Sequence, residues 1–115
     1  MLKITMEFRR GILFIRLGGK LVQSESMKFK KNIIDKIKEN GIRSVVFNIN
    51  DLKEIDLKGV HNFFYIYELC RQNKGKVLVC KVYDSPVFEK LKKKRFFQYA
   101  EVISNELEAF EVIKI

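Results

Sequence analysis

The sequence contains one proline, one histidine, two cysteines and six glycines among its 115 residues. So little proline and glycine, with hydrophobic residues at 47% and charged residues at 32%, excludes a disordered or low-complexity chain. No segment is apolar for long enough to span a membrane, and charges every few residues at the N-terminus exclude a signal peptide. We therefore predict one soluble domain over residues 1–115, located in the cytoplasm.

The scarcity of histidine and cysteine also limits the possible chemistry. One histidine and two cysteines provide no metal-ligand spacing. Cys70 and Cys80 lie in apolar helix and strand patterns, which predicts buried, reduced thiols. His61 could pair with Asp56 or Glu54, but no nucleophile is placed to use it, so we favour a partly buried structural histidine over a catalytic one. With no glycine-rich phosphate loop either, we predict neither an enzyme nor a cofactor.

Positive charge is abundant, since 23 Lys and Arg outnumber 14 Asp and Glu and give a net charge of +9. Such a charge suits a nucleic-acid or anionic-membrane partner, but the lysines are scattered along every segment, which favours a merely Lys-rich composition. The densest basic run is Lys90–Arg95, close to Phe88, Phe96 and Phe97. It fits either nucleic-acid or lipid binding, or a short amphipathic helix with solvated lysines. We favour the helix, because the aromatic residues fit a core pattern.

Hydrophobic periodicity predicts strands that alternate with helices. Segments with period two and short β-branched runs indicate strands, and segments with a 3.6-residue period indicate amphipathic helices. The predicted strands are 2–8, 12–17, 45–49, 76–82 and 99–104. The predicted helices are 24–40, one from 57 to about 72, one that begins at 86, and 105–113. A hairpin followed by alternating helices and strands predicts an α/β domain, with a mixed sheet of about five strands and about four helices.

Individual residues mark the expected boundaries. Gly18-Gly19 should end the second strand, with Leu21 and Val22 as an irregular extension, and residues 50–55 should form a loop. Ser24 or Ser26, Asp56 and Ser85 are expected to cap the starts of helices, and Gly41 to end the first helix. Pro86 follows Ser85 in an expected turn over residues 83–86. The last helix is expected to bury Leu107, Phe110 and Val112 or Ile113.

The central stretch 44–71 resembles the STAS domain of bacterial anti-sigma-factor antagonists. In that family a strand leads through a loop to Asp-Ser-Ser-Gly-Leu-Gly at the start of the next helix, and here Ile55–Val60, IDLKGV, stands in that place. Asp56 and Gly59 match the motif. The spacing of Gly41–Asn50, Gly75-Lys76, Ser85-Pro86 and Leu91-Lys92 fits the same pattern. The resemblance covers nearly the whole chain.

Leu57 departs from the family at its phosphorylation site. The first residue after the Asp is the serine or threonine that the anti-sigma kinase phosphorylates, whereas Leu57 has no hydroxyl group. No phosphorylation is therefore expected there, and Ser24, Ser26, Ser85 and Thr5 each have a capping or strand role instead. Leu57 either packs against Ile55 or is exposed as an apolar anchor. Lys58 is either a solvated lysine or a contact to an acidic surface or anion.

The resemblance implies a non-catalytic regulator that binds a kinase-type anti-sigma factor and so controls sigma-dependent transcription. The expected binding surface joins the start of the central helix to the loop before the first helix. Its residues are Asp56, Leu57, Lys58, Gly59, Val60, His61, Lys20, Leu21, Val22, Gln23 and Ser24. Two alternatives are a STAS-like subunit of another complex, in lipid transport or signalling, and a nucleic-acid-binding module that uses Lys90–Arg95.

Overall fold

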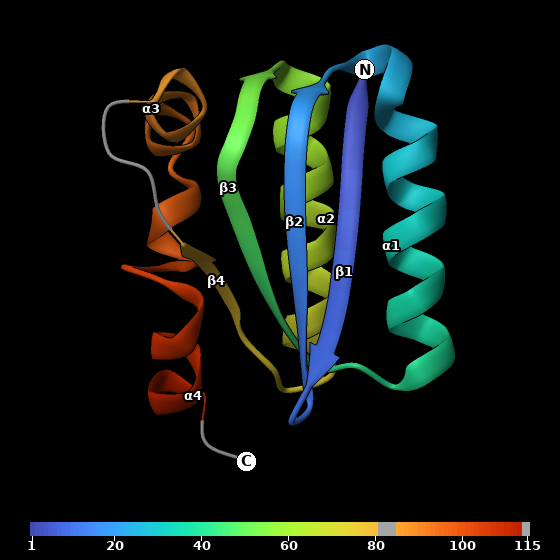
Figure 1. The fold of residues 1–115 in the computed structure, drawn as a ribbon, viewed down its shortest axis with the longest axis vertical. Helices are drawn as coiled ribbons and strands as arrows, with labels where there is room; N and C mark the ends of the chain where they lie inside the picture. Colours follow the sequence, from blue (N-terminus) through green and yellow to red (C-terminus); the bar gives the residue numbers. More distant parts are fainter. Residues whose placement is uncertain (81–84, 114–115) are drawn as a thin grey trace.

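The computed structural model describes residues 1–80 and 85–113, which build a five-stranded sheet with its strands in chain order (Figure 1). Strand β1 (Leu2–Arg9) pairs antiparallel with β2 (Ile12–Leu21). Strands β3 (Ser44–Ile55), β4 (Val77–Cys80) and β5 (Glu101–Ile103) are added in parallel. The predicted mixed sheet is confirmed.

The β1–β2 hairpin closes through a two-residue turn. Arg10 has a φ of 51° and Gly11 a φ of 82°, between the paired residues Arg9 and Ile12. Positive φ at both central positions defines a type I′ turn, whose twist matches that of the two strands. This turn fixes the register that places Leu2, Ile4 and Met6 of β1 against the main core.

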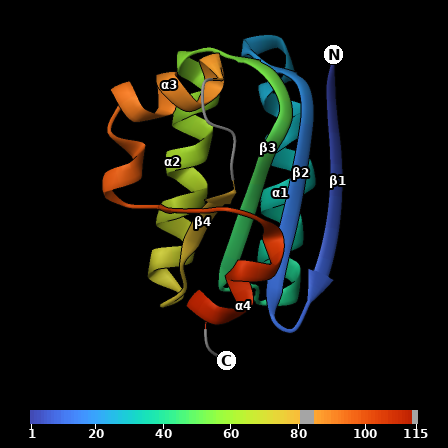
Figure 2. The ribbon, with the colours of Figure 1, turned by 60° about the vertical axis from the view of Figure 1, so that its left-hand side comes forward.

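Four helices surround the sheet: α1 (Ser26–Asn40), α2 (Leu57–Gln72), α3 (Pro86–Lys93) and α4 (Ala109–Val112). Short 3₁₀ turns are formed by η1 (Gln23–Glu25), η2 (Phe96–Gln98) and η3 (Glu106–Glu108). Each parallel strand is added on the same side of the previous one, so right-handed crossovers place α1 and α2 on one face. Figure 2 shows α3 across the end of the molecule where α2 begins, and α4 on the opposite face of the sheet.

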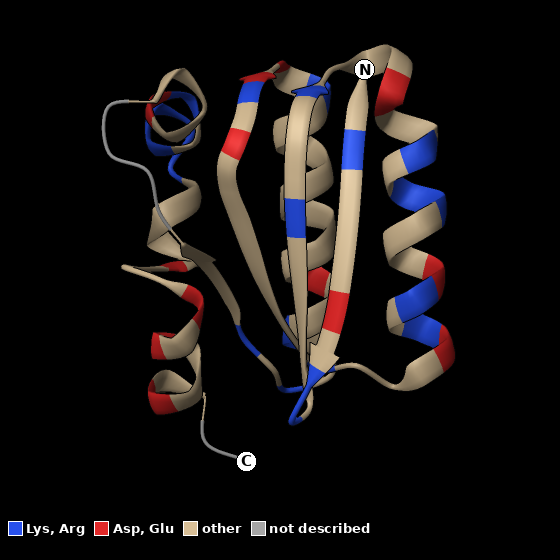
Figure 3. Ribbon diagram, in the orientation of Figure 1, with Lys and Arg blue, Asp and Glu red and all other residues tan. Residues whose placement is uncertain are grey.

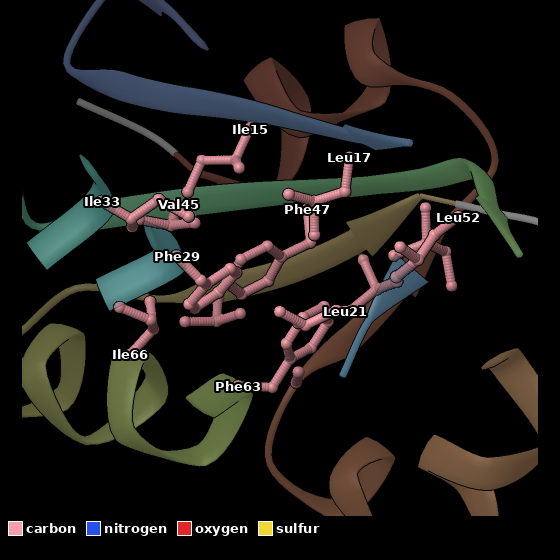
Figure 4. Packing of buried hydrophobic residues seen from close by; sticks show 14 of the residues in the cluster. Ile15, Leu17, Leu21, Phe29, Ile33, Val45, Phe47, Leu52, Phe63 and Ile66 are labelled. Atoms are coloured by element: carbon pink, nitrogen blue, oxygen red, sulfur yellow. The ribbon is translucent and has the colours of Figure 1, made fainter. Parts of the chain in front are cut away.

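Three phenylalanines hold the main core together. Phe29 of α1, Phe47 of β3 and Phe63 of α2 are each 0% exposed, and Figure 4 shows their rings meeting between the sheet and the helices. The ring centroids of Phe47 and Phe63 are 4.1 Å apart with a 13° interplanar angle, and those of Phe29 and Phe63 are 6.1 Å apart. Burying each ring contributes about 1.5–3 kcal/mol. The cluster fixes both helices on the sheet.

A smaller core lies on the other face. Phe14 of β2 contacts Phe110 of α4 with ring centroids 5.5 Å apart, and the Arg9 and Arg10 guanidinium groups each lie 5.4 Å from the Phe110 centroid. Next to this cluster, the Glu106 carboxylate accepts hydrogen bonds from Arg16 Nε (2.8 Å), Arg16 Nη2 (2.7 Å) and Asn48 Nδ2 (2.9 Å). Apolar and polar contacts together fasten the C-terminal segment to the sheet.

The two strands that lead to the candidate site are longer than predicted. Strand β2 does not end at Gly18-Gly19, since register shifts on either side of this pair carry it on to Leu21. A Cβ on Gly19, at a φ of +83°, would lie 1.9 Å from the Met1 carbonyl oxygen, which explains the glycine. The predicted loop 50–55 is likewise part of β3, with Leu52 and Ile55 buried. The register shifts at Gly18-Gly19 mark a β-bulge. This bulge breaks the alternation of apolar and polar residues by which a strand is recognised in a sequence.

The helix boundaries hold with two corrections. Neither Ser24 nor Ser26 caps α1; instead the Ser26 hydroxyl accepts a hydrogen bond from Asn62 Nδ2 (2.9 Å), a buried contact between α1 and α2. Leu107 is 68% exposed rather than buried, because a 3₁₀ turn replaces the first turn of the predicted last helix. The predicted strand residues 81–82 and turn residues 83–84 lie outside the described part of the chain. Ser85 caps α3 as predicted, with Pro86 as the first helical residue.

Both cysteines are buried and outside any disulfide, as predicted. Cys70 is 0% exposed and Cys80 is 3% exposed. Burial disfavours the thiolate and raises the pKa of Cys70 to about 12.

Candidate functional site

The Asp56 carboxylate joins two segments that are distant in sequence. Its Oδ1 accepts from the Gly59 backbone N–H (2.9 Å), which is an N-cap, and its Oδ2 accepts from the Gln23 N–H (2.8 Å). The Asp56 N–H donates in turn to the Leu21 carbonyl oxygen (3.2 Å). The start of α2 and the connection from β2 to α1 therefore form one surface, the juxtaposition that the sequence analysis expected.

The predicted site residues differ in burial. Leu21, Gly59 and Val60 are buried, so they support the surface from beneath and are not placed to touch another molecule. The residues that reach solvent wholly or in part are Lys20, Val22, Gln23, Ser24, Asp56, Leu57, Lys58 and His61. A partner could contact only this second group.

Gly59 allows α2 to begin close against the sheet. A Cβ at this position would lie 2.5 Å from the Leu21 carbonyl oxygen and 2.6 Å from Cγ1 of Ile55. Both distances are shorter than real Cβ contacts. One of the two neighbours is a backbone atom, which cannot move aside as a flexible side chain can. The absence of a side chain at Gly59 is therefore needed for the hydrogen bonds of Asp56.

An exposed stripe runs along the first turns of α2. Leu57 is 53% exposed and Tyr65 is 43% exposed, and His61 between them is exposed as well. Residues spaced by four share one side of a helix. The stripe settles the alternatives for Leu57, which does not tuck in against Ile55. The expectation that His61 is partly buried is wrong, because the buried side of α2 is formed by Gly59, Phe63 and Ile66 instead. Tyr65 was missed because the sequence pattern assigns aromatic residues to the core.

The basic side chains of the surface are held weakly, if at all, by other described residues. Lys20 Nζ lies 3.6 Å from Glu54 Oε1, with both side chains more than half exposed, so the pair contributes little to stability. No ion pair between described residues involves Lys58 or His61. In the same part of the chain, no group of three or more metal-ligating side chains is close enough to hold an ion.

A family model for the STAS domain matches residues 3–109. The chain belongs to the STAS domain family. An anti-sigma F factor antagonist from Paenibacillus polymyxa is 27% identical over 114 residues, which covers 99% of this chain and 97% of the relative. The chain is thus an anti-sigma factor antagonist-like STAS domain, as its sequence indicated.

Solved structures of anti-sigma factor antagonists share its fold. A candidate anti-sigma factor antagonist of Thermotoga maritima superposes with a TM-score of 0.88 at 14% identity, over 97% of this chain and 95% of that one. Unphosphorylated SpoIIAA, an anti-sigma factor antagonist, gives a TM-score of 0.76 at 19% identity, over 98% of this chain and 100% of that one. The phosphorylated Bacillus protein gives 0.74 at 18% identity, over 96% of this chain and 100% of that one. At these identities the likeness establishes the fold alone.

The STAS domain also places its basic run next to the stripe on α2. Leu57, the α3 residues Lys90 and Lys93, and Lys94 directly after α3 line one groove. The sequence gives no sign of this proximity, because Lys90 lies 33 positions after Leu57. None of the helices within residues 1–80 and 85–113 has the length and apolar character needed to cross a membrane.

Proposed function

We propose that this STAS domain acts in the cytoplasm as an anti-sigma factor antagonist that binds a kinase-type anti-sigma factor, and that no phosphate is added at the family position. Leu57 carries the proposal: it follows the capping Asp56 directly, is 53% exposed, and has no hydroxyl group. Binding the anti-sigma factor would release a sigma factor and so turn on transcription. The Paenibacillus relative, itself an anti-sigma F factor antagonist, supports this choice of partner.

The proposed binding surface consists of the exposed residues around Asp56. Leu57 offers an apolar side chain to the partner, and Lys58 and Lys20 add positive charge on either side. Asp56 acts within the chain, because both oxygens of its carboxylate are taken by backbone N–H groups of Gly59 and Gln23. Leu21, Gly59 and Val60 hold this arrangement from below.

The direct test is calorimetric titration of the purified chain with a kinase-type anti-sigma factor encoded in the same genome. We expect a stable complex that Leu57→Asp and Lys58→Glu each weaken by about tenfold or more, since each substitution changes a contact inside the interface. Lys36→Glu, on an exposed part of α1, is the control and should change little. Unchanged affinity in both interface variants would place the interface elsewhere.

The absence of a phosphate switch has its own test. After incubation with the anti-sigma factor and ATP, intact-mass spectrometry of this chain should show no added phosphate. Phosphate anywhere on the chain would contradict a mode of action that phosphorylation does not control.

A further inference from the structure

The groove beside Leu57 is formed by the start of α2 and one side of α3, and has a volume of about 840 Å³. Leu57 and Pro86 contribute apolar surface to it. Figure 2 shows α3 beside the first turn of α2, and Figure 3 shows the blue lysine and arginine segments gathered on and just after α3. The groove is thus continuous with the surface around Asp56 but is made largely by a different element.

The groove has a one-sided charge. Four lysines line it, Lys90, Lys92, Lys93 and Lys94, against a single carboxylate, Glu89. All four are exposed, and no ion pair between described residues involves any of them. Their positive charge is therefore not neutralised within the described part of the chain and is available to a partner.

The fold holds these lysines on a rigid support. The Ser85 hydroxyl accepts from the Phe88 N–H (2.9 Å) at the start of α3, and Val87 and Leu91 are each 0% exposed on its inner side. Lys90 and Lys93 therefore lie on the outer side of a helix whose inner side is anchored in the main core. Cations on a fixed helix lose less conformational entropy on binding than cations on a loop.

We infer that this groove receives an acidic segment of the protein partner. Carboxylates of that segment would lie against Lys90, Lys93 and Lys94, while an apolar side chain would pack on Leu57 and Pro86. The inference rests on the proposed function and extends it, because it adds α3 to the binding surface and states the chemistry of the partner.

The structure favours a protein over a nucleic acid in this groove. The aromatic residues that accompany the basic run face inward: Phe96 is 0% exposed, and Phe97 stacks on Phe88 with ring centroids 4.8 Å apart. These rings are therefore not available to stack on bases. Proteins that bind single-stranded nucleic acids usually combine such stacking with a basic groove. The apolar floor and the Glu89 carboxylate also suit a mixed acidic and apolar peptide better than a phosphate backbone.

The test compares two triple variants with the same change in net charge. One replaces Lys90, Lys93 and Lys94 by Glu, and the control replaces Lys31, Lys36 and Lys38 by Glu on the exposed side of α1, across the molecule (Figure 1). Circular dichroism verifies that both fold. We expect the groove variant to lose about tenfold or more of its affinity for the anti-sigma factor, mainly through slower association, and the control to lose much less. The difference should shrink in high salt.

The outcomes separate the inference from the proposed function. If Leu57→Asp weakens the complex while the groove variant matches its control, the proposed function stands and the inference is wrong. If the groove variant instead loses affinity for single-stranded RNA or DNA and keeps it for the anti-sigma factor, the groove is a nucleic-acid site and the inference is again wrong.

A second measurement does not need the anti-sigma factor. The ¹⁵N-labelled chain is titrated with a synthetic peptide of alternating Glu and Leu, and with a Lys and Leu peptide as control. The acidic peptide should shift the amide resonances of Leu57, Lys90 and Lys93, whereas the basic peptide should leave them in place. Absence of shifts at the groove with the acidic peptide would overturn the inference even if no anti-sigma factor bound.

Discussion

At the scale of single residues, the site depends on Asp56 and Gly59 acting together. The Asp56 carboxylate fixes two backbone N–H groups, one at the start of α2 and one at Gln23. Those hydrogen bonds form only because α2 begins close to β2, which requires the missing side chain at Gly59. Asp56 and Gly59, which match the family motif in the sequence, are therefore the residues that shape the turn, and Leu57 between them has no hydroxyl group.

Gly59→Ala should destabilise the chain by about 1–2 kcal/mol. Alanine in a helix gains up to about 1 kcal/mol over glycine, but a Cβ only 2.5 Å from the Leu21 carbonyl oxygen forces a backbone shift that costs about 1–3 kcal/mol. Urea unfolding measures the difference. Gly18→Ala is the control, since its Cβ would meet nothing nearer than 3.6 Å, so it should change stability little. Equal effects in both variants would contradict the packing role of Gly59.

At the scale of elements, the type and order of the helices and strands follow from the sequence, but the ends of β2 and β3 do not. Segments with an uninterrupted hydrophobic pattern, such as 45–49 and 57–72, form the predicted strand and helix. The segment 50–55 was predicted as a loop because its polar residues face solvent on both sides of buried Leu52, and only pairing with β2 makes it a strand. The Asp56 cap was predictable from local chemistry. The groove was not, since it joins Leu57 to α3 only through the fold.

The C-terminal segment should be held more firmly at neutral than at acid pH. Hydrogen bonds from Arg16 and Asn48 hold the pKa of Glu106 below its usual value of 4.5. A carboxyl whose pKa is lowered by folding adds stability that is present above the unfolded pKa and is lost as the pH falls through the folded pKa. Glu106→Gln should therefore cost about 1–2 kcal/mol at pH 7, a value kept modest because the Arg16 side chain is 38% exposed.

Chemical unfolding at about pH 7 and about pH 3 measures this effect. The gap between the original chain and Glu106→Gln should narrow at the lower pH, as the fall in pH begins to remove the charge of Glu106 that the variant lacks. Glu111→Gln, an exposed acid of α4, is the control and should show no such gap. A gap of constant size at both pH values would assign the loss to packing rather than to charge.

At the scale of the whole molecule, the binding features gather at one end of the sheet. In a parallel sheet the carboxyl ends of the strands and the first turns of the following helices lie at the same edge. The connections after β2, β3 and β4 lead there into α1, α2 and α3. Lys20–Ser24, Asp56–His61 and the basic groove thus lie where three successive strands lead into the helices that follow them. The opposite end carries the hairpin turn and Gly41, which link elements without forming part of the surface.

Burial in the two cores should protect both thiols until the molecule unfolds. Because Cys70 and Cys80 are buried and burial raises the pKa of Cys70 to about 12, Ellman's reagent should modify the native chain on the order of a hundredfold or more slower than the chain in denaturant. The absorbance of the released thiolate follows the reaction. A thiol that reacts quickly in the native chain would show that α2 or β4 opens without global unfolding.

Helix α3 has a further consequence for how this protein behaves in solution. Among the described residues, β3 pairs with β4 only over 45–48, so its second half has a strand neighbour on the β2 side alone, and α3 packs beside it (Figure 1). An uncovered strand edge invites pairing with a strand of another molecule. Losing the packing of Val87 and Leu91 would therefore expose this strand edge and make the chain prone to aggregation. Substitutions that probe the groove have to leave that inner side of α3 intact.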